Sequence, residues 1–113
     1  MRIAIVGSRN YPALDDVRRY VNSLPADTVI VSGGARGVDI TAEEAARKRG
    51  LATIIYPADW TKYGKQAGFR RNRQIVEDCD QVVAFWDGKS HGTAHSLRLA
   101  VAMGKPFVVN PAQ

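Results

Sequence analysis

Glycines and polar side chains that could bind an anion are gathered in residues 86–95, which read WDGKSHGTAH. The apolar run 81–85 precedes this stretch, and a segment with helical spacing, 93–103, begins within it. The order is therefore strand, glycine loop and helix. A loop of this kind exposes unpaired backbone N–H groups at the positive end of the helix dipole, where an anion is stabilised. The stretch predicts a phosphate site.

Two further loops have the same layout. Residues 32–39 (SGGARGVD) follow the apolar run 28–31, and residues 7–10 (GSRN) follow the run 3–6. Three glycine loops behind three strands predict one phosphate-rich ligand at one edge of a sheet. Any one of these glycines could instead be a simple turn residue. The candidate ligand-binding residues of the three loops are Gly7, Ser8, Arg9, Ser32, Gly33, Gly34, Arg36, Gly37, Asp39, Trp86, Gly88, Ser90, Gly92, Thr93 and His95.

Several of these side chains have two interpretations. The guanidinium groups of Arg9 and Arg36 suit bidentate contact with phosphate, but they could equally form surface ion pairs. Thr93 could cap the last helix or bind phosphate, and one cap can do both. Asp39 could cap its helix, bind a ribose hydroxyl or act as a general base. A Thr41–Glu44 capping box is the alternative start of that helix.

Other groups bear on chemistry less directly. Asp87 is the one acidic residue of the stretch 86–95, and acid–base work at a glycosidic bond usually needs a carboxylate. His91 and His95 are four residues apart, but we expect His91 to precede the helix. No third ligand lies near them, so no metal site is predicted. Three aromatic residues could stack on a base or belong to the core or an interface: Trp60, Tyr63 and Trp86.

The elements that must position these loops alternate regularly. Strands are predicted at residues 2–6, 28–31, 52–56, 81–85 and 107–109. Helices are predicted from Pro12 to just before Pro25, after residue 39 up to Gly50, and over residues 69–78 and 93–103. The longer connection 58–68 is predicted as a loop, and such loops are often functional.

This alternation predicts an α/β fold. It consists of one domain, residues 1–113, with a single Rossmann-like open parallel five-stranded sheet and helices on both faces. The expected strand order is 3-2-1-4-5. Ligands of such sheets bind outside the strand carboxyl ends, where the strand order reverses. The ligand site is therefore expected between strands one and four.

Composition narrows the function class. The chain has 113 residues, 45% of them hydrophobic and 24% charged, with a net charge of +5. The charge fits an anionic ligand, a solvated basic surface or nucleic acid. Three arginines in the predicted first turn of helix 69–78 oppose the helix dipole, so an anion nearby is expected.

With one cysteine and no apolar run of the ~20 residues that span a bilayer, we expect a cytoplasmic protein without a membrane partner. A homo-oligomer, dimer or larger, is also expected.

The same loops, together with residues 56–60 (YPADW) and 71–73 (RNR), resemble the YspA-type branch of the SLOG superfamily. That superfamily includes the Lonely Guy phosphoribohydrolases and DNA-processing protein A. The resemblance implies a Rossmann-like fold and a nucleotide or nucleotide-derived ligand, and it adds Arg71 and Asn72 to the candidate ligand-binding residues. The arginine of the enzyme branch falls near Arg71. Its glutamate position is Ser96 here, and the last loop is longer.

Three functions follow. The favoured one is a nucleotide-binding module, acting as a sensor or a processing module, whose ligand is a mononucleotide or a compound like NAD or ADP-ribose. The alternative is an enzyme that hydrolyses the N-glycosidic bond of a nucleotide, with Arg71 and Asp87 as catalytic residues. The third is a nucleic-acid-binding module. No cofactor is assigned beyond the nucleotide-type ligand.

Overall fold

The computed structural model describes residues 1–111. Its sheet has five parallel strands in the order β3-β2-β1-β4-β5. This confirms the predicted α/β class and strand order. The strands are β1 (Arg2–Gly7), β2 (Val29–Ser32), β3 (Ala52–Ile55), β4 (Gln81–Trp86) and β5 (Phe107–Pro111).

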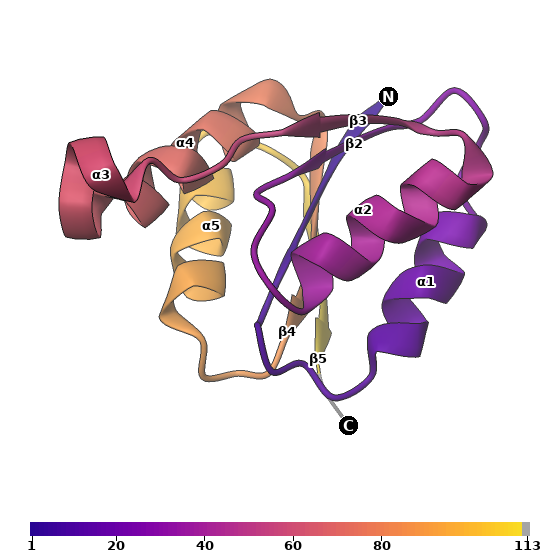
Figure 1. The fold of residues 1–113 in the computed structure, drawn as a ribbon, viewed down its shortest axis with the longest axis horizontal. Helices are drawn as coiled ribbons and strands as arrows, with labels where there is room; N and C mark the ends of the chain where they lie inside the picture. Colours follow the sequence, from indigo (N-terminus) through magenta and orange to yellow (C-terminus); the bar gives the residue numbers. More distant parts are fainter. Residues whose placement is uncertain (112–113) are drawn as a thin grey trace.

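Helices cover both faces of the sheet (Figure 1). The helices α1 (Leu14–Asn22) and α2 (Val38–Arg49) pack on one face, and α4 (Ala67–Asp78) and α5 (His91–Ala102) pack on the other. Strands β1 and β4 are apolar on both faces because each face meets a helix layer. None of the helices in residues 1–111 has the length and apolar character needed to cross a bilayer.

Several helix boundaries differ from the prediction. The first helix begins at Leu14, with Ala13 as its N-cap, rather than at Pro12. The last begins at His91 rather than Thr93, so the expectation that His91 precedes it was wrong. The long connection is not a plain loop. It contains the four-residue helix α3 (Trp60–Tyr63) and a 3₁₀ turn, η1 (Gly64–Gln66).

Helix α4 starts at Ala67, two residues earlier than predicted. Arg71 and Arg73 therefore lie beyond its first turn, where the field of the helix dipole has weakened. Of the three arginines, Arg70 alone remains in the first turn, so the expectation that all three oppose the dipole was wrong.

The first and last glycine loops are joined at the carboxyl end of the sheet. Ser8 follows β1, and its backbone N–H donates to the Phe85 carbonyl oxygen of the neighbouring strand at 3.1 Å. Its hydroxyl oxygen accepts from the backbone N–H of Asp87, also at 3.1 Å. Ser8 is fully buried. These two contacts fix the loops on either side of the point where the strand order reverses.

Candidate functional site

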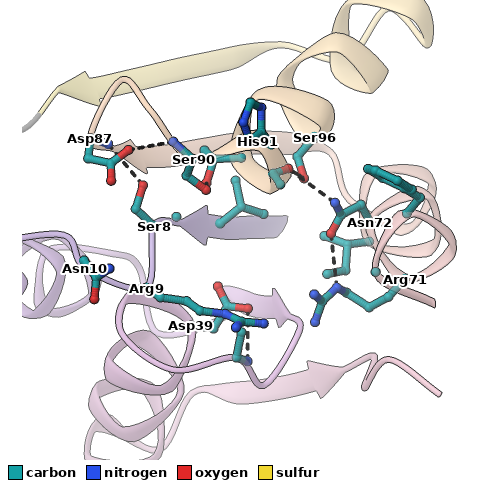
Figure 2. A pocket seen from close by; sticks show the side chains of 18 of the residues that line it. Ser8, Arg9, Asn10, Asp39, Arg71, Asn72, Asp87, Ser90, His91 and Ser96 are labelled. Atoms are coloured by element: carbon teal, nitrogen blue, oxygen red, sulfur yellow. Dashed lines mark hydrogen bonds between the residues drawn. The ribbon is translucent and has the colours of Figure 1, made fainter. Parts of the chain in front are cut away.

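A pocket of about 600 Å³ lies at this point, between the ends of β1 and β4. Figure 2 shows side chains of the first loop, the last loop and helix α4 around it. Basic groups outnumber acidic groups on its wall: Arg9, Lys65, Arg71 and Lys89 against Asp39 and Asp87. The pocket is therefore electropositive, as the loops predicted.

The N-terminus of α5 forms one side of the pocket. His91, Gly92 and Thr93 are its first three residues, and all three line the cavity. The N–H groups of a first helical turn have no partner within the helix. The N-cap of α5 is Ser90, which makes no side-chain capping hydrogen bond, so the alternative in which Thr93 caps this helix was wrong. The Thr93 hydroxyl instead lies 3.3 Å from that of Ser90.

The loop before α5 is shaped by Asp87. Its Oδ1 accepts from the backbone N–H groups of Lys89 at 2.8 Å and Ser90 at 2.9 Å. These two bonds stabilise the carboxylate and lower the pKa of Asp87 below its ordinary value. Asp87 is therefore ionised at neutral pH, and one of its oxygens already serves the backbone.

Arg71 lies on α4 and is held by two contacts. Its Nη1 donates to the Gly33 carbonyl oxygen at 2.8 Å, and its Nε donates to Asn72 Oδ1 at 3.1 Å. The Asn72 amide continues to α5, where Nδ2 donates to the Gly92 carbonyl oxygen at 3.3 Å and lies 3.2 Å from His95 Nδ1. A single network thus links the second glycine loop, α4 and the start of α5.

The absence of a side chain at Gly33 leaves room for the side chain of Arg71. A Cβ at Gly33 would lie 2.6 Å from Arg71 Nη1 and 2.9 Å from its Cδ. Burial lowers the pKa of Arg71, the charge of Arg9 lowers it further, and the charge of Asp39 opposes the shift. The two guanidinium groups are therefore close enough to repel each other. An anion between them would relieve that repulsion.

Arg9 reaches the pocket from the first loop. Its side chain is exposed and, within residues 1–111, makes no hydrogen bond or ion pair. Figure 2 shows its side chain extending away from the first loop, and Arg9 lines the pocket. The backbone beneath it depends on Gly37, whose φ is +80° and whose ideal Cβ would lie 2.4 Å from the Arg9 carbonyl oxygen.

Asp39 is buried in the first turn of α2, and its Oδ2 accepts from the Ala35 N–H at 3.3 Å. Burial raises the pKa of Asp39 to about 7, although the Ala35 N–H and the Arg71 charge oppose the shift. The N-cap of α2 is Gly37, without a side-chain cap. The capping role predicted for Asp39 was therefore wrong, and so was the Thr41–Glu44 capping box.

The second loop is shaped by a residue that the sequence interpretation missed. Glu43 is buried, and its Oε2 accepts from the Ser32 hydroxyl at 2.6 Å and the Gly34 N–H at 2.9 Å. Ser32 is therefore occupied by an internal contact. The signal in the sequence is the spacing of four between Asp39 and Glu43, which puts both carboxylates on one face of α2.

The pocket wall includes part of the predicted site. The predicted residues that line it are Gly7, Ser8, Arg9, Asp39, Arg71, Asn72, Asp87, Ser90, Gly92 and Thr93. Those that lie outside its wall, within the described chain, are Ser32, Gly33, Gly34, Arg36, Gly37, Trp86, Gly88 and His95. Trp86 supports the wall from behind, since its Nε1 donates to the Ser90 carbonyl oxygen at 3.0 Å. His95 packs edge-on against Phe69, with ring centroids 4.6 Å apart.

Other lining residues were not predicted as ligand groups. They are Val6, Asn10, Ala35, Lys65, Gly68, Phe69, Ile75, Lys89, His91 and Ser96, together with Trp60, for which base stacking, the core and an interface had been left open. Trp60, Lys65, Gly68 and Phe69 belong to the segment predicted as a loop or to the helix after it. No glycine motif marks this segment. Its basic and aromatic composition was the available signal.

Comparisons with known proteins agree with this architecture. The family model for YAcAr, described as the YspA, cpYpsA-related SLOG family, matches residues 1–63. The Gene 61 protein of Mycobacterium phage D29 is 35% identical over 117 residues, covering 95% of this chain and 94% of that protein.

Two solved structures of DNA processing protein A share the fold. The Streptococcus pneumoniae protein has a TM-score of 0.86 at 24% identity and covers 99% of this chain, which spans 50% of that protein. The Helicobacter pylori protein, whose structure describes a single-stranded DNA binding mode, has a TM-score of 0.75 at 28% identity and covers 100% of this chain, which spans 66% of that protein. The family match covers more than half of the sequence. This chain therefore belongs to the YspA, cpYpsA-related SLOG family.

Proposed function

We propose that the pocket binds a nucleotide or a nucleotide-derived ligand through its phosphate, as a sensor or a processing module. One observation carries the proposal. Arg9 and Arg71, which are distant in sequence, converge in the same pocket as the first turn of α5. Two guanidinium groups and a helix N-terminus are a strong combination for a phosphate, because the donors are fixed and the ligand charge is opposite.

The proposed roles follow from the mobility of each group. The N–H groups of Gly92 and Thr93 are fixed by the helix, so they would set the phosphate position. Arg71 is anchored at the Gly33 carbonyl oxygen and would contribute directed charge. Arg9 has no described partner and would close over the ligand. The Ser90 hydroxyl is a further donor at the same wall.

The rest of a nucleotide would extend toward α3 and α4. The rings of Trp60 and Phe69 line the pocket, and each residue is 52% exposed. Exposed aromatic rings beside an electropositive pocket suit stacking on a base. Asp39 lies between the phosphate position and the second loop, where its carboxyl could bond a ribose hydroxyl.

The hydrolase alternative was predicted with Arg71 and Asp87 as its catalytic residues, and the pocket changes the choice of carboxyl group. A general acid or base works best when its pKa is near the working pH. Of the two pocket carboxyls, Asp39 meets that condition and Asp87 does not. If the nucleotide is cleaved, Asp39 is the better candidate for proton transfer and Asp87 for shaping the loop. Release of free base from AMP, compared between the wild type and Asp39→Asn, tests this step.

Single-stranded nucleic acid is the second candidate ligand. Two observations favour it: the 28% identity to a DNA processing protein A described in a single-stranded DNA binding mode, and the net charge of +5. The pocket groups would then bind one nucleotide unit of a strand, and Trp60, Lys65 and Phe69 would contact its neighbours. This candidate uses the same phosphate position as the first.

Isothermal titration tests the shared claim. The probes are AMP, ATP, NAD, ADP-ribose and a thymidine oligonucleotide, each at low and at physiological salt. We expect Arg9→Ala to weaken the bound probe by about 10- to 100-fold, the effect of removing a charged hydrogen bond. Arg36→Ala is the matched control. It removes the same charge from a neighbouring loop but not from the pocket wall.

The outcomes separate the candidates. Binding of a free nucleotide with little salt dependence supports the nucleotide-binding proposal. Binding of the oligonucleotide alone, with affinity falling steeply as salt rises, supports single-stranded nucleic acid as the ligand, because a strand releases counterions from several phosphates. No binding by any probe, or equal losses in Arg9→Ala and Arg36→Ala, would overturn the phosphate site.

A further inference from the structure

The outer edge of the sheet at β5 has an open set of backbone groups. Within residues 1–111, β5 pairs with β4 alone. Val82 of β4 donates to the Pro106 carbonyl oxygen at 2.9 Å, and Val83 is in register with Val108. Successive residues of a strand direct their backbone groups to opposite sides. Phe107 and Val109 therefore direct their N–H and C=O groups away from the sheet.

The side chains of this edge are also uncovered. Phe107 is 45% exposed, Val108 is 47% exposed and Val109 is 36% exposed. Exposed edge strands are normally protected by charged side chains, and residues 107–110 (FVVN) carry none. An apolar edge of this kind readily pairs with another strand.

Helix α5 extends the apolar surface over one face. Phe107 and Val109 are in register with Val82 and Ala84, which pack in the core beneath α4 and α5. Val101 is 63% exposed. It lies on the side of α5 turned away from α4, since His95 marks the α4 side by its contact with Phe69. We call Val101, Phe107, Val108 and Val109 the edge patch.

We propose that two copies of the chain associate through antiparallel pairing of β5 with β5, about a two-fold axis at Val108. The outward groups of Phe107 in one copy then meet those of Val109 in the other. Each such pair exchanges two hydrogen bonds, and the symmetry generates the second pair. Val108 faces the Val108 of the other copy across the axis. The two sheets join, and the assembly closes as a symmetric dimer.

The buried area sets the strength of this contact. From their exposed fractions, the four edge-patch residues contribute on the order of 300 Å² per copy, against about 800 Å² per partner in a standard interface. The dimer is therefore weak and reversible. Each copy carries a net charge of +5, so repulsion opposes association and salt strengthens it. Nucleic-acid binding has the opposite salt dependence.

Sedimentation velocity of the full chain over a concentration series tests the proposal, which does not depend on the pocket ligand. The wild type is expected to move from 12.4 kDa toward twice that mass as concentration and salt rise. Val108→Lys places two ammonium groups opposite each other at the axis and should keep the chain monomeric. Ile55→Lys is the matched control, because Ile55 is 38% exposed on β3, the other edge strand.

Opposite charges at residue 108 of the two copies give the most specific test of this pairing. Val108→Glu should also be monomeric alone, but an equimolar mixture with Val108→Lys should restore the dimer, because residue 108 pairs with itself only about this axis. If circular dichroism shows that Val108→Lys is unfolded, Val101→Lys replaces it. A wild type that stays at 12.4 kDa, a dimer lost in Ile55→Lys but kept in Val108→Lys, or a mixture that remains monomeric would overturn the proposal.

Discussion

Replacing Asp39 by asparagine should change how the stability of the protein depends on pH. Asparagine has nearly the same shape, and its side-chain oxygen can still accept from the Ala35 N–H. It removes the one carboxyl of the pocket whose pKa is raised, from 3.8 to about 7. The unfolded chain releases the proton of Asp39 near its ordinary pKa, whereas the folded chain keeps it up to about pH 7.

The sign and size of the change in stability with pH follow from this difference between the folded and unfolded pKa of Asp39. Protonation of Asp39 favours the folded state, so its contribution is complete below the unfolded pKa and is lost as pH rises through the folded pKa. One pKa unit corresponds to about 1.4 kcal/mol, so the loss between about pH 5 and pH 8 is about 2.5 kcal/mol. The free energy of unfolding of Asp39→Asn, relative to the wild type, should rise by that amount over this range. A folded pKa one unit lower would still give about 1.4 kcal/mol.

Urea unfolding of both proteins at several pH values measures the quantity directly. Other titrating groups contribute equally to both chains, so they cancel in the difference. A difference that stays constant within about 0.5 kcal/mol between about pH 5 and pH 8 would show that Asp39 titrates normally when folded. In that case burial would not make Asp39 a proton-transfer group near neutral pH.

Two further substitutions test the second loop. Gly33→Ala should displace the Arg71 guanidinium and weaken binding of AMP or a thymidine oligonucleotide by at least about 10-fold, while the melting temperature changes little because a flexible side chain absorbs the clash. Unchanged binding in isothermal titration would mean that the position of Arg71 does not depend on a glycine at residue 33. Glu43→Ala should lower the free energy of unfolding by about 2–4 kcal/mol, because it leaves the buried donors of the Ser32 hydroxyl and the Gly34 N–H unpaired. The exposed Glu44→Ala should stay within about 0.5 kcal/mol, and equal effects in urea unfolding would refute a special role for Glu43.

The sheet and its order were predictable because the signals are local and repeated. Each strand is a short apolar run, and each helix carries apolar residues at helical spacing, so parallel alternation leaves few arrangements. Helix α3 was missed for the opposite reason. It has four residues, none of them buried, and its N-cap is Asp59, whose carboxylate accepts from the Lys62 N–H at 3.0 Å. Such a helix has no apolar period to detect.

The candidate site was predictable at the level of loops but not of contacts. Parallel topology brings residues 7–10, 32–39 and 86–95 to one edge, and that much follows from the order of strands. Which side chains face the cavity depends on partners far away in sequence. Arg71 meets the Gly33 carbonyl oxygen across 38 residues, and Ser8 meets Asp87 across 79. Helix and strand periodicity contain no information on such pairs.

The buried hydroxyl of Ser8 has a consequence for the thermodynamics of recognition. Since it fastens the loop after β1 to the loop after β4, the walls of the cavity are immobilised when the chain folds. If the pocket binds a ligand as proposed, that ligand would therefore lose little free energy to ordering those walls. The proposed ligand would then meet a preorganised cavity, in which the exposed side chain of Arg9 is the group that can still adjust.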